Sequence, residues 1–85
     1  MVDLPMKSGL EQALAAAGSA HDDYERVVLK GVRDELWAGF YAAFVLGRLG
    51  EFVEASRLAL LLEEVDAPAD WPAAAAGHVL TKLRS

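Results

Sequence analysis

Residues 36–47 read LWAGFYAAFVLG, a run without a charged side chain that lies between Glu35 and Arg48. The run is too short to cross a bilayer, because a transmembrane helix needs about 20 apolar residues. Its aromatic side chains fall on one face of a helix: Trp37, Phe40, Tyr41 and Phe44. Since Val45 and Leu49 widen the apolar arc, we expect either a central helix packed on several sides or a helix with one face given to a partner.

The composition bounds the class of protein. The chain has 85 residues, the size of one domain, and no cysteine, so disulfides and thiolate metal sites are excluded. Its net charge of −5 disfavours nucleic acid binding, including a helix-turn-helix regulator, because DNA-binding domains usually carry a basic surface. The N-terminal MVDLPMKSG lacks the apolar run of a signal peptide, and we expect a cytoplasmic protein with no membrane contact.

The first predicted helix covers residues 9–17, after an irregular lead-in over residues 1–7. Ser8 is a suitable N-cap, and Glu11, three residues later, completes a capping box. Gly18 suits the left-handed conformation that commonly ends a helix, so the helix is expected to stop there.

The second predicted helix begins at Ser19 and carries an apolar stripe of tyrosine and valines. Gly31 weakens it, so the chain either bends there or ends a helix near Val32 and restarts at Asp34. The third helix then runs from Asp34 to Leu49, where the following glycine stops it.

The fourth predicted helix covers residues 51–66, and its inner face leaves Leu60 and Leu61 outside. After a loop, the fifth helix covers residues 71–83, with Pro72 in its first turn, where a missing amide proton costs nothing. The whole chain, residues 1–85, is therefore predicted to be one all-α domain. We expect a compact four- to five-helix bundle or a helix-hairpin array, with the third helix central and the fourth antiparallel to it.

An internal repeat appears when the chain is shifted by 34 residues. WAGFYAAFVLGRL (37–49) then lies over WPAAAAGHVLTKL (71–83) without a gap. Trp37 meets Trp71, and the matched apolar residues include Val45 with Val79. A period near 34 is typical of helix-turn-helix solenoids, although these usually need about three repeats.

Residues 37–68 also resemble a degenerate tetratricopeptide repeat. The residues that carry the resemblance sit in the turn and second helix: Gly50, Glu51, Phe52, Glu54 and Ala55. Ala59 and Leu62 depart from the family pattern, and Pro68 arrives about one residue late. The resemblance implies stacked helix hairpins for protein or peptide contact. WAGFYAAF is also similar to a pattern in small bacterial helical proteins, a likeness that implies no activity.

Both histidines are candidates for chemistry, and each has a simpler interpretation. His21 and Glu25 share a helix face at the spacing of a ligand pair, but nothing supplies the second pair that a dimetal bundle needs. The interpretation we prefer for this segment is helix capping and compensation of the helix dipole. His78 takes the place of Phe44 in the repeat and is read as a packed neighbour of the core. We predict no catalytic residue, no metal and no cofactor.

The first functional hypothesis is a non-enzymatic protein that acts through contact with itself or with another protein. The apolar surplus points to a surface formed by these residues: Trp37, Tyr41, Leu60 and Leu61. The alternative is a small-molecule-binding or enzymatic domain with a pocket near Tyr41, Trp71 and His78. Tyrosine, tryptophan and histidine suit such a pocket because each combines an apolar ring with a polar group.

Overall fold

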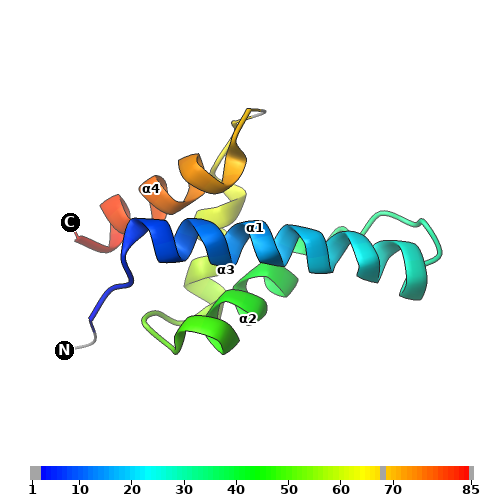
Figure 1. Cartoon of the computed structure of the whole chain (residues 1–85), viewed down its shortest axis with the longest axis horizontal. Coiled ribbons are helices and arrows are strands. Elements are labelled where there is room, and N and C mark those ends of the chain that lie inside the picture. The colour runs from blue at the N-terminus through cyan, green and yellow to red at the C-terminus, as the bar shows by residue number, and fades with distance from the viewer. Residues whose placement is uncertain (1–2, 68, 85) are drawn as a thin grey trace.

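The computed structural model describes residues 3–67 and 69–84, so Pro68, part of the tetratricopeptide resemblance, lies outside the described residues. Within these ranges the chain forms four α-helices and no strand, which confirms the predicted all-α class (Figure 1). The helices are α1 (Lys7–Asp23), α2 (Trp37–Leu49), α3 (Ala55–Glu63) and α4 (Trp71–Arg84). A short π-helix, η1 (Tyr24–Val28), continues α1.

The long helix α1 holds the bundle together. It packs against α2 and against α4, while α3 contacts the same two helices. In Figure 1, α3 rises behind α1 from the α2 side to the α4 side. Each helix thus contacts two others, so residues 37–49 are no more central than the rest, and the expectation that they form the central helix is wrong. The C-terminal end of α1 and η1 project beyond the bundle as an arm (Figure 1).

Alanine is a frequent residue in the core. Six alanines are at most 2% exposed: Ala13, Ala17, Ala38, Ala42, Ala75 and Ala76. Small side chains let helix backbones approach closely, and larger aliphatic residues fill the space between them. The largest fully buried side chains are Leu10, Leu14, Leu58, Leu62, Leu80, Val45 and Val79. An alanine-rich sequence of this length therefore still encloses a continuous core.

The first helix does not end at Gly18, as predicted, but continues to Asp23. Its buried stripe keeps helical spacing through Ala17 to His21, so packing continues beyond the glycine. A Cβ built at Gly18 would lie 3.2 Å from the hydroxyl of Tyr41. Gly18 is therefore a site of close approach between α1 and α2 rather than a helix cap.

The separate helix predicted from Ser19 is also wrong, because this segment completes α1 and then forms η1. The amide of Leu29 donates to the carbonyl of Tyr24 at 3.1 Å, and that of Gly31 donates to Glu25 at 2.8 Å. Lys30 and Gly31 then take positive φ angles of 55° and 87°, and the chain leaves the helix there. The predicted break near Gly31 thus exists, but no helix reaches Val32.

Helices α2 and α3 each begin three or four residues later than predicted. Helix α2 begins at Trp37 rather than Asp34 and ends at Leu49, before Gly50 with φ 91°, as expected. Helix α3 begins at Ala55 rather than residue 51 and is correspondingly short. On this helix Leu61 lies inside the core, whereas Leu60 is 62% exposed.

The two halves of the predicted repeat occupy corresponding places in the bundle. Helices α2 and α4 begin at the matched residues Trp37 and Trp71, and both pack against α1 and α3. Three matched pairs are buried: Ala42 with Ala76, Val45 with Val79, and Leu46 with Leu80. The 34-residue offset therefore relates two helices with similar buried faces.

The glycines inside the helices offer a direct test of these packing assignments. An added Cβ meets nothing within 4 Å at Gly39 or Gly47. Gly39→Ala and Gly47→Ala should each raise the free energy of unfolding by about 0.5–1 kcal/mol, because alanine is the better helix former. Gly18→Ala should raise the free energy of unfolding by less, because the added Cβ would crowd the Tyr41 hydroxyl. Urea unfolding of the three variants at low protein concentration measures the order, and an equal gain at all three positions would contradict the close approach.

Candidate functional site

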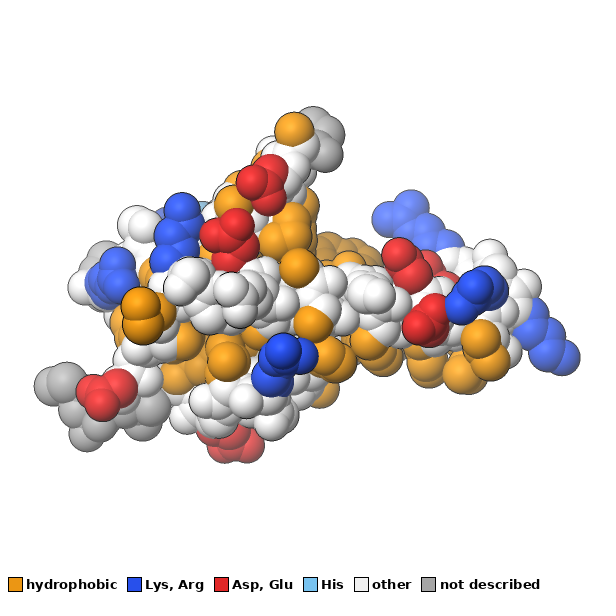
Figure 2. Space-filling model, viewed as in Figure 1, with side chains coloured by type: hydrophobic (Ala, Val, Ile, Leu, Met, Phe, Trp, Pro, Cys, Tyr) orange, Lys and Arg blue, Asp and Glu red, His pale blue; other side chains and the backbone are white. Residues whose placement is uncertain are grey.

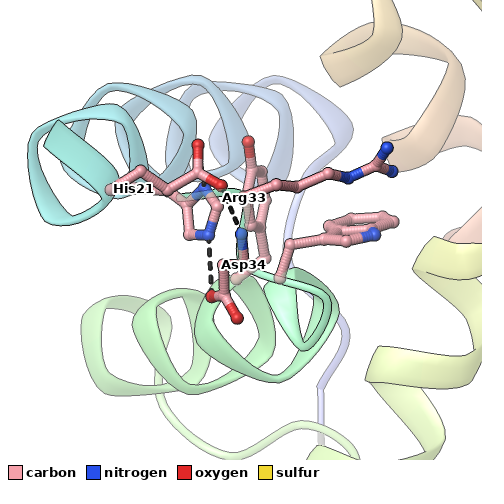
Figure 3. Close-up of a pocket in the computed structure, with 6 residues that line it drawn as sticks. His21, Arg33 and Asp34 are labelled. Atoms are coloured by element: carbon pink, nitrogen blue, oxygen red, sulfur yellow. Dashed lines mark hydrogen bonds and ion pairs between the residues drawn. The ribbon is translucent and has the colours of Figure 1, made fainter. Parts of the chain in front are cut away.

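A cavity of about 380 Å³ opens where the end of α1 meets the start of α2. Its lining combines acidic, basic and aromatic side chains: His21, Glu25, Arg33, Asp34, Trp37 and Tyr41 (Figure 3). Among the described residues, the lining holds no serine, threonine or cysteine. The groups that could take part in chemistry are the imidazole, the two carboxylates, the Tyr41 phenol and the Arg33 guanidinium.

His21 is the buried polar residue of the core, with 5% of its surface exposed. Its Nε2 lies 3.0 Å from Oδ2 of Asp34, and its Nδ1 lies 3.9 Å from Oε1 of Glu25. The imidazole also meets the ring of Phe40 edge-on, with centroids 5.0 Å apart. The preferred interpretation, a helix start at this segment, is wrong, because His21 lies within α1 and anchors a distant loop.

Asp34 makes three hydrogen bonds, of which two join that loop to the arm and one lies within the loop. Besides its bond to His21, its Oδ1 accepts from the amide of Leu36 at 2.9 Å, and its own amide donates to Glu25 at 2.7 Å. The bonds from His21 and from the Leu36 amide lower the pKa of Asp34, because both stabilise the charged carboxylate. We call this set of bonds the His21–Asp34 clamp, since it holds residues 29–36 against α1.

The aromatic residues beside the cavity pack against one another. Trp37, Tyr41 and Trp71 meet edge to face, with centroids 5.3–5.7 Å apart. The indole N–H of Trp71 donates to the carbonyl of Val65 at 3.2 Å. Burial, with the negative charges of Asp22 and Glu25, raises the pKa of Tyr41. The three rings therefore tie α2 to the start of α4, and their close contact leaves no room for a ligand between them.

The pocket predicted from Tyr41, Trp71 and His78 is assembled only in part. Tyr41 and Trp71 are in contact, but neither Trp71 nor His78 lines the cavity. The Nε2 of His78 instead lies 2.7 Å from Oε1 of Glu64, a pair that ties the loop before α4 to that helix. The histidine of the cavity is therefore His21 rather than His78, which the sequence had suggested.

The carboxylates and the imidazole of the cavity are already hydrogen-bonded within the chain. Both oxygens of Asp34 and one oxygen of Glu25 accept hydrogen bonds from within the chain. Within residues 3–67 and 69–84, no group of three or more His, Asp or Glu side chains is placed to hold a metal ion, so His21 and Glu25 lack the further ligand they would need. The geometry is that of a structural clamp.

The predicted interface residues lie in three different environments. Trp37 and Tyr41 are half-buried in the aromatic cluster, and Leu61 is 7% exposed in the core. The expectation that Leu61 lies outside the inner face is wrong. Leu60 is exposed, as expected, but it lies on α3, away from the other exposed apolar side chains that the chain segment 27–36 contributes.

A different apolar surface runs along α2. Its residues are exposed or half-buried and recur at helical spacing: Leu36, Gly39, Phe40, Ala43, Phe44 and Gly47. We call this surface the α2 outer face. It adjoins η1 through the rings of Phe40 and Tyr24, whose centroids are 5.3 Å apart, and η1 exposes Val27 and Val28. Figure 2 shows hydrophobic side chains along the lower edge of the arm.

The α2 outer face was only half visible in the sequence. The width of the apolar arc predicted that one side of this helix could serve a partner. The aromatic pattern did not say which rings face outward, because Trp37 and Tyr41 share their side of the helix with Phe40 and Phe44. The signal that the sequence offered was the helical spacing of the uncharged residues Leu36, Ala43 and Gly47.

The comparisons with known proteins leave the site to be interpreted from its geometry. No protein-family model, curated protein or solved structure matches this chain. In the part of the chain that the structure describes, no helix has both the length and the apolar character needed to span a bilayer.

Proposed function

We propose that this protein acts through contact with a protein and that the α2 outer face is the contact surface. The observation that carries the proposal is an exposed helix face without an ionisable group from Leu36 to Gly47. Leu36, just before α2, is 79% exposed, and Gly39, Ala43 and Gly47 are exposed on the helix itself, where a monomeric protein usually carries polar or charged residues. Contiguous exposed apolar surface of this kind typically marks an interaction site.

The glycines of the α2 outer face support the same proposal. Gly39 and Gly47 each weaken the helix by about 1 kcal/mol relative to alanine. Nothing in the described chain needs the space, since an added Cβ at either position meets no atom within 4 Å. A partner that approaches the backbone of α2 would use that space.

A contact function also agrees better with the cavity than catalysis does. The carboxylates around His21 are bonded to the chain itself, and His21 is too deeply buried to meet a substrate freely. The cavity instead fixes the loop that carries Leu36 to the start of the α2 outer face. Its polar network thus supports the surface that we propose to be functional.

Site-specific photocrosslinking tests the proposal in cells that express the chain. A photoreactive phenylalanine analogue at Ala43, exposed on the α2 outer face, should form a covalent adduct of defined mass. The same analogue at Ala74, exposed on α4, is the matched control and should give no such adduct. Equal labelling at the two positions, or none at Ala43, would overturn the proposal.

A further inference from the structure

We infer that the occupant of the α2 outer face is a second copy of this chain, paired helix to helix with the two α2 segments antiparallel. This inference rests on the proposed function and names its partner. A two-fold axis would pass at the level of Tyr41 and Ala42, so that each copy presents the same surface to the other.

Charge complementarity selects both the partner and its direction. Exposed Glu35 precedes α2, and exposed Arg48 lies in its last turn; neither makes an ion pair within the described chain. In an antiparallel pair, Glu35 of each copy comes within reach of the partner's Arg48, and two such pairs form by symmetry. A parallel pair would place like charges together. Antiparallel packing also opposes the two helix dipoles, which is favourable.

The absence of charge between these two ends matters for a chain with a net charge of −5. Two copies repel each other on most approaches, because like charges accumulate on both surfaces. The α2 outer face carries no ionisable group, so two copies can meet there without burying unpaired carboxylates. The self-complementary ends then fix the register.

The sizes of the side chains fit the same arrangement. In the register that pairs Glu35 with the partner's Arg48, each small residue of this face lies opposite a larger one. Each Phe44 then lies over the partner's Gly39, and each Phe40 lies over the partner's Ala43. Each Leu36 likewise lies over the partner's Gly47. Aromatic rings thus meet the positions where the helix offers open space.

The surface is large enough for a weak dimer. The largest apolar patches on ordinary monomers cover about 300–600 Å². Two copies that pair through a patch of that size bury about 600–1,200 Å² in total, which is the range of weak and transient interfaces. We therefore expect a reversible monomer–dimer equilibrium that depends on protein concentration.

Sedimentation equilibrium of the purified chain over a concentration series tests the pairing. The wild type should show a reversible dimer, and Ala43→Glu should raise the dissociation constant by about 100-fold, because it buries a carboxylate of each copy in an apolar interface. Circular dichroism should show that Ala43→Glu keeps the helical fold, since Ala43 is exposed. The control Ala74→Glu adds the same charge on α4 and should dimerise like the wild type.

Charge exchange tests the direction of the helices. Glu35→Arg and Arg48→Glu should each weaken the dimer about tenfold, and the double variant should recover it. A double variant that stays as weak as the single ones would overturn the antiparallel pairing.

A wild type that remains monomeric at every concentration would overturn the second copy as partner. In that case, a crosslinked adduct at Ala43 with the mass of another protein would still support the proposed function. An adduct of twice the chain mass would support both, so the failures of the two proposals are distinguishable.

Discussion

Leu61→Glu should unfold this protein, whereas the same substitution at the neighbouring Leu60 should leave it folded. Leu61 is 7% exposed and belongs to the core, so a glutamate there must bury an unpaired charge or break the packing of α3. The expected loss is about 4 kcal/mol or more. A domain of this length has a total stability of only about 4–13 kcal/mol, so this loss removes much or all of it.

Circular dichroism with urea unfolding measures the difference between the two leucines. Leu60→Glu is the matched control, because Leu60 is 62% exposed on the same helix and its glutamate reaches water. We expect its free energy of unfolding to stay within about 0.5 kcal/mol of the wild type. Similar effects at both positions would contradict the register of α3. The result also decides which leucine can be used to probe association, since an unfolded variant says nothing about a surface.

The helix signals that depend on neighbouring residues predicted the fold well. Gly50 ends α2 at Leu49 with a positive φ, and Trp71 with Pro72 begins α4, as the sequence indicates. These features are local, because a cap or a stop needs only a few adjacent residues. The all-α class follows from the same helical spacing of apolar residues.

The features that sequence reasoning missed depend on contacts between distant segments. Gly18 has the composition of a helix end, but Tyr41 on another helix packs against it, and tertiary packing overrides the local signal. The bond between His21 and Asp34 spans thirteen residues, and no periodicity reveals it. Leu61 was misplaced because the buried arc of α3 is wider than the predicted inner face: Leu58 and Leu62 are buried, and Leu61 beside them is covered as well.

The candidate contact surface also combines a feature that neighbouring residues predict with one that depends on contacts between distant segments. The uncharged run 36–47 indicated a helix whose apolar arc is wider than one packed face. Whether a ring points inward depends on where α1 and α4 lie, and the sequence does not contain that information. Trp37 and Tyr41 therefore meet Trp71 inside the bundle, while Phe40 and Phe44 lie on the outer face.

His21→Ala should destabilise the protein by about 2–4 kcal/mol, because it leaves a cavity among aromatic rings and removes a donor from Asp34. The substitution should also release residues 29–36, which the His21–Asp34 clamp holds against α1. Hydrogen exchange would detect this as faster exchange of the amides of Asp34 and Leu36, which both donate within the clamp. Unchanged exchange at these amides would show that the loop is held by other contacts.

The acid dependence of stability isolates the contribution of the Asp34 charge. Bonds from His21 and from the Leu36 amide lower the pKa of Asp34 in the folded protein below its ordinary value of 3.8. A carboxyl with a lowered folded pKa stabilises the fold above its unfolded pKa, and this stabilisation is lost as the pH falls through the folded pKa. Asp34→Asn should therefore be less stable than the wild type at neutral pH, and the difference should shrink below about pH 3.8. Urea unfolding across the pH series measures it, and Asp66→Asn, at an exposed position, controls for the loss of one negative charge. A difference that stays constant into the acid range would mean that the charge of Asp34 adds no stability, and the clamp would then rest on hydrogen bonding alone.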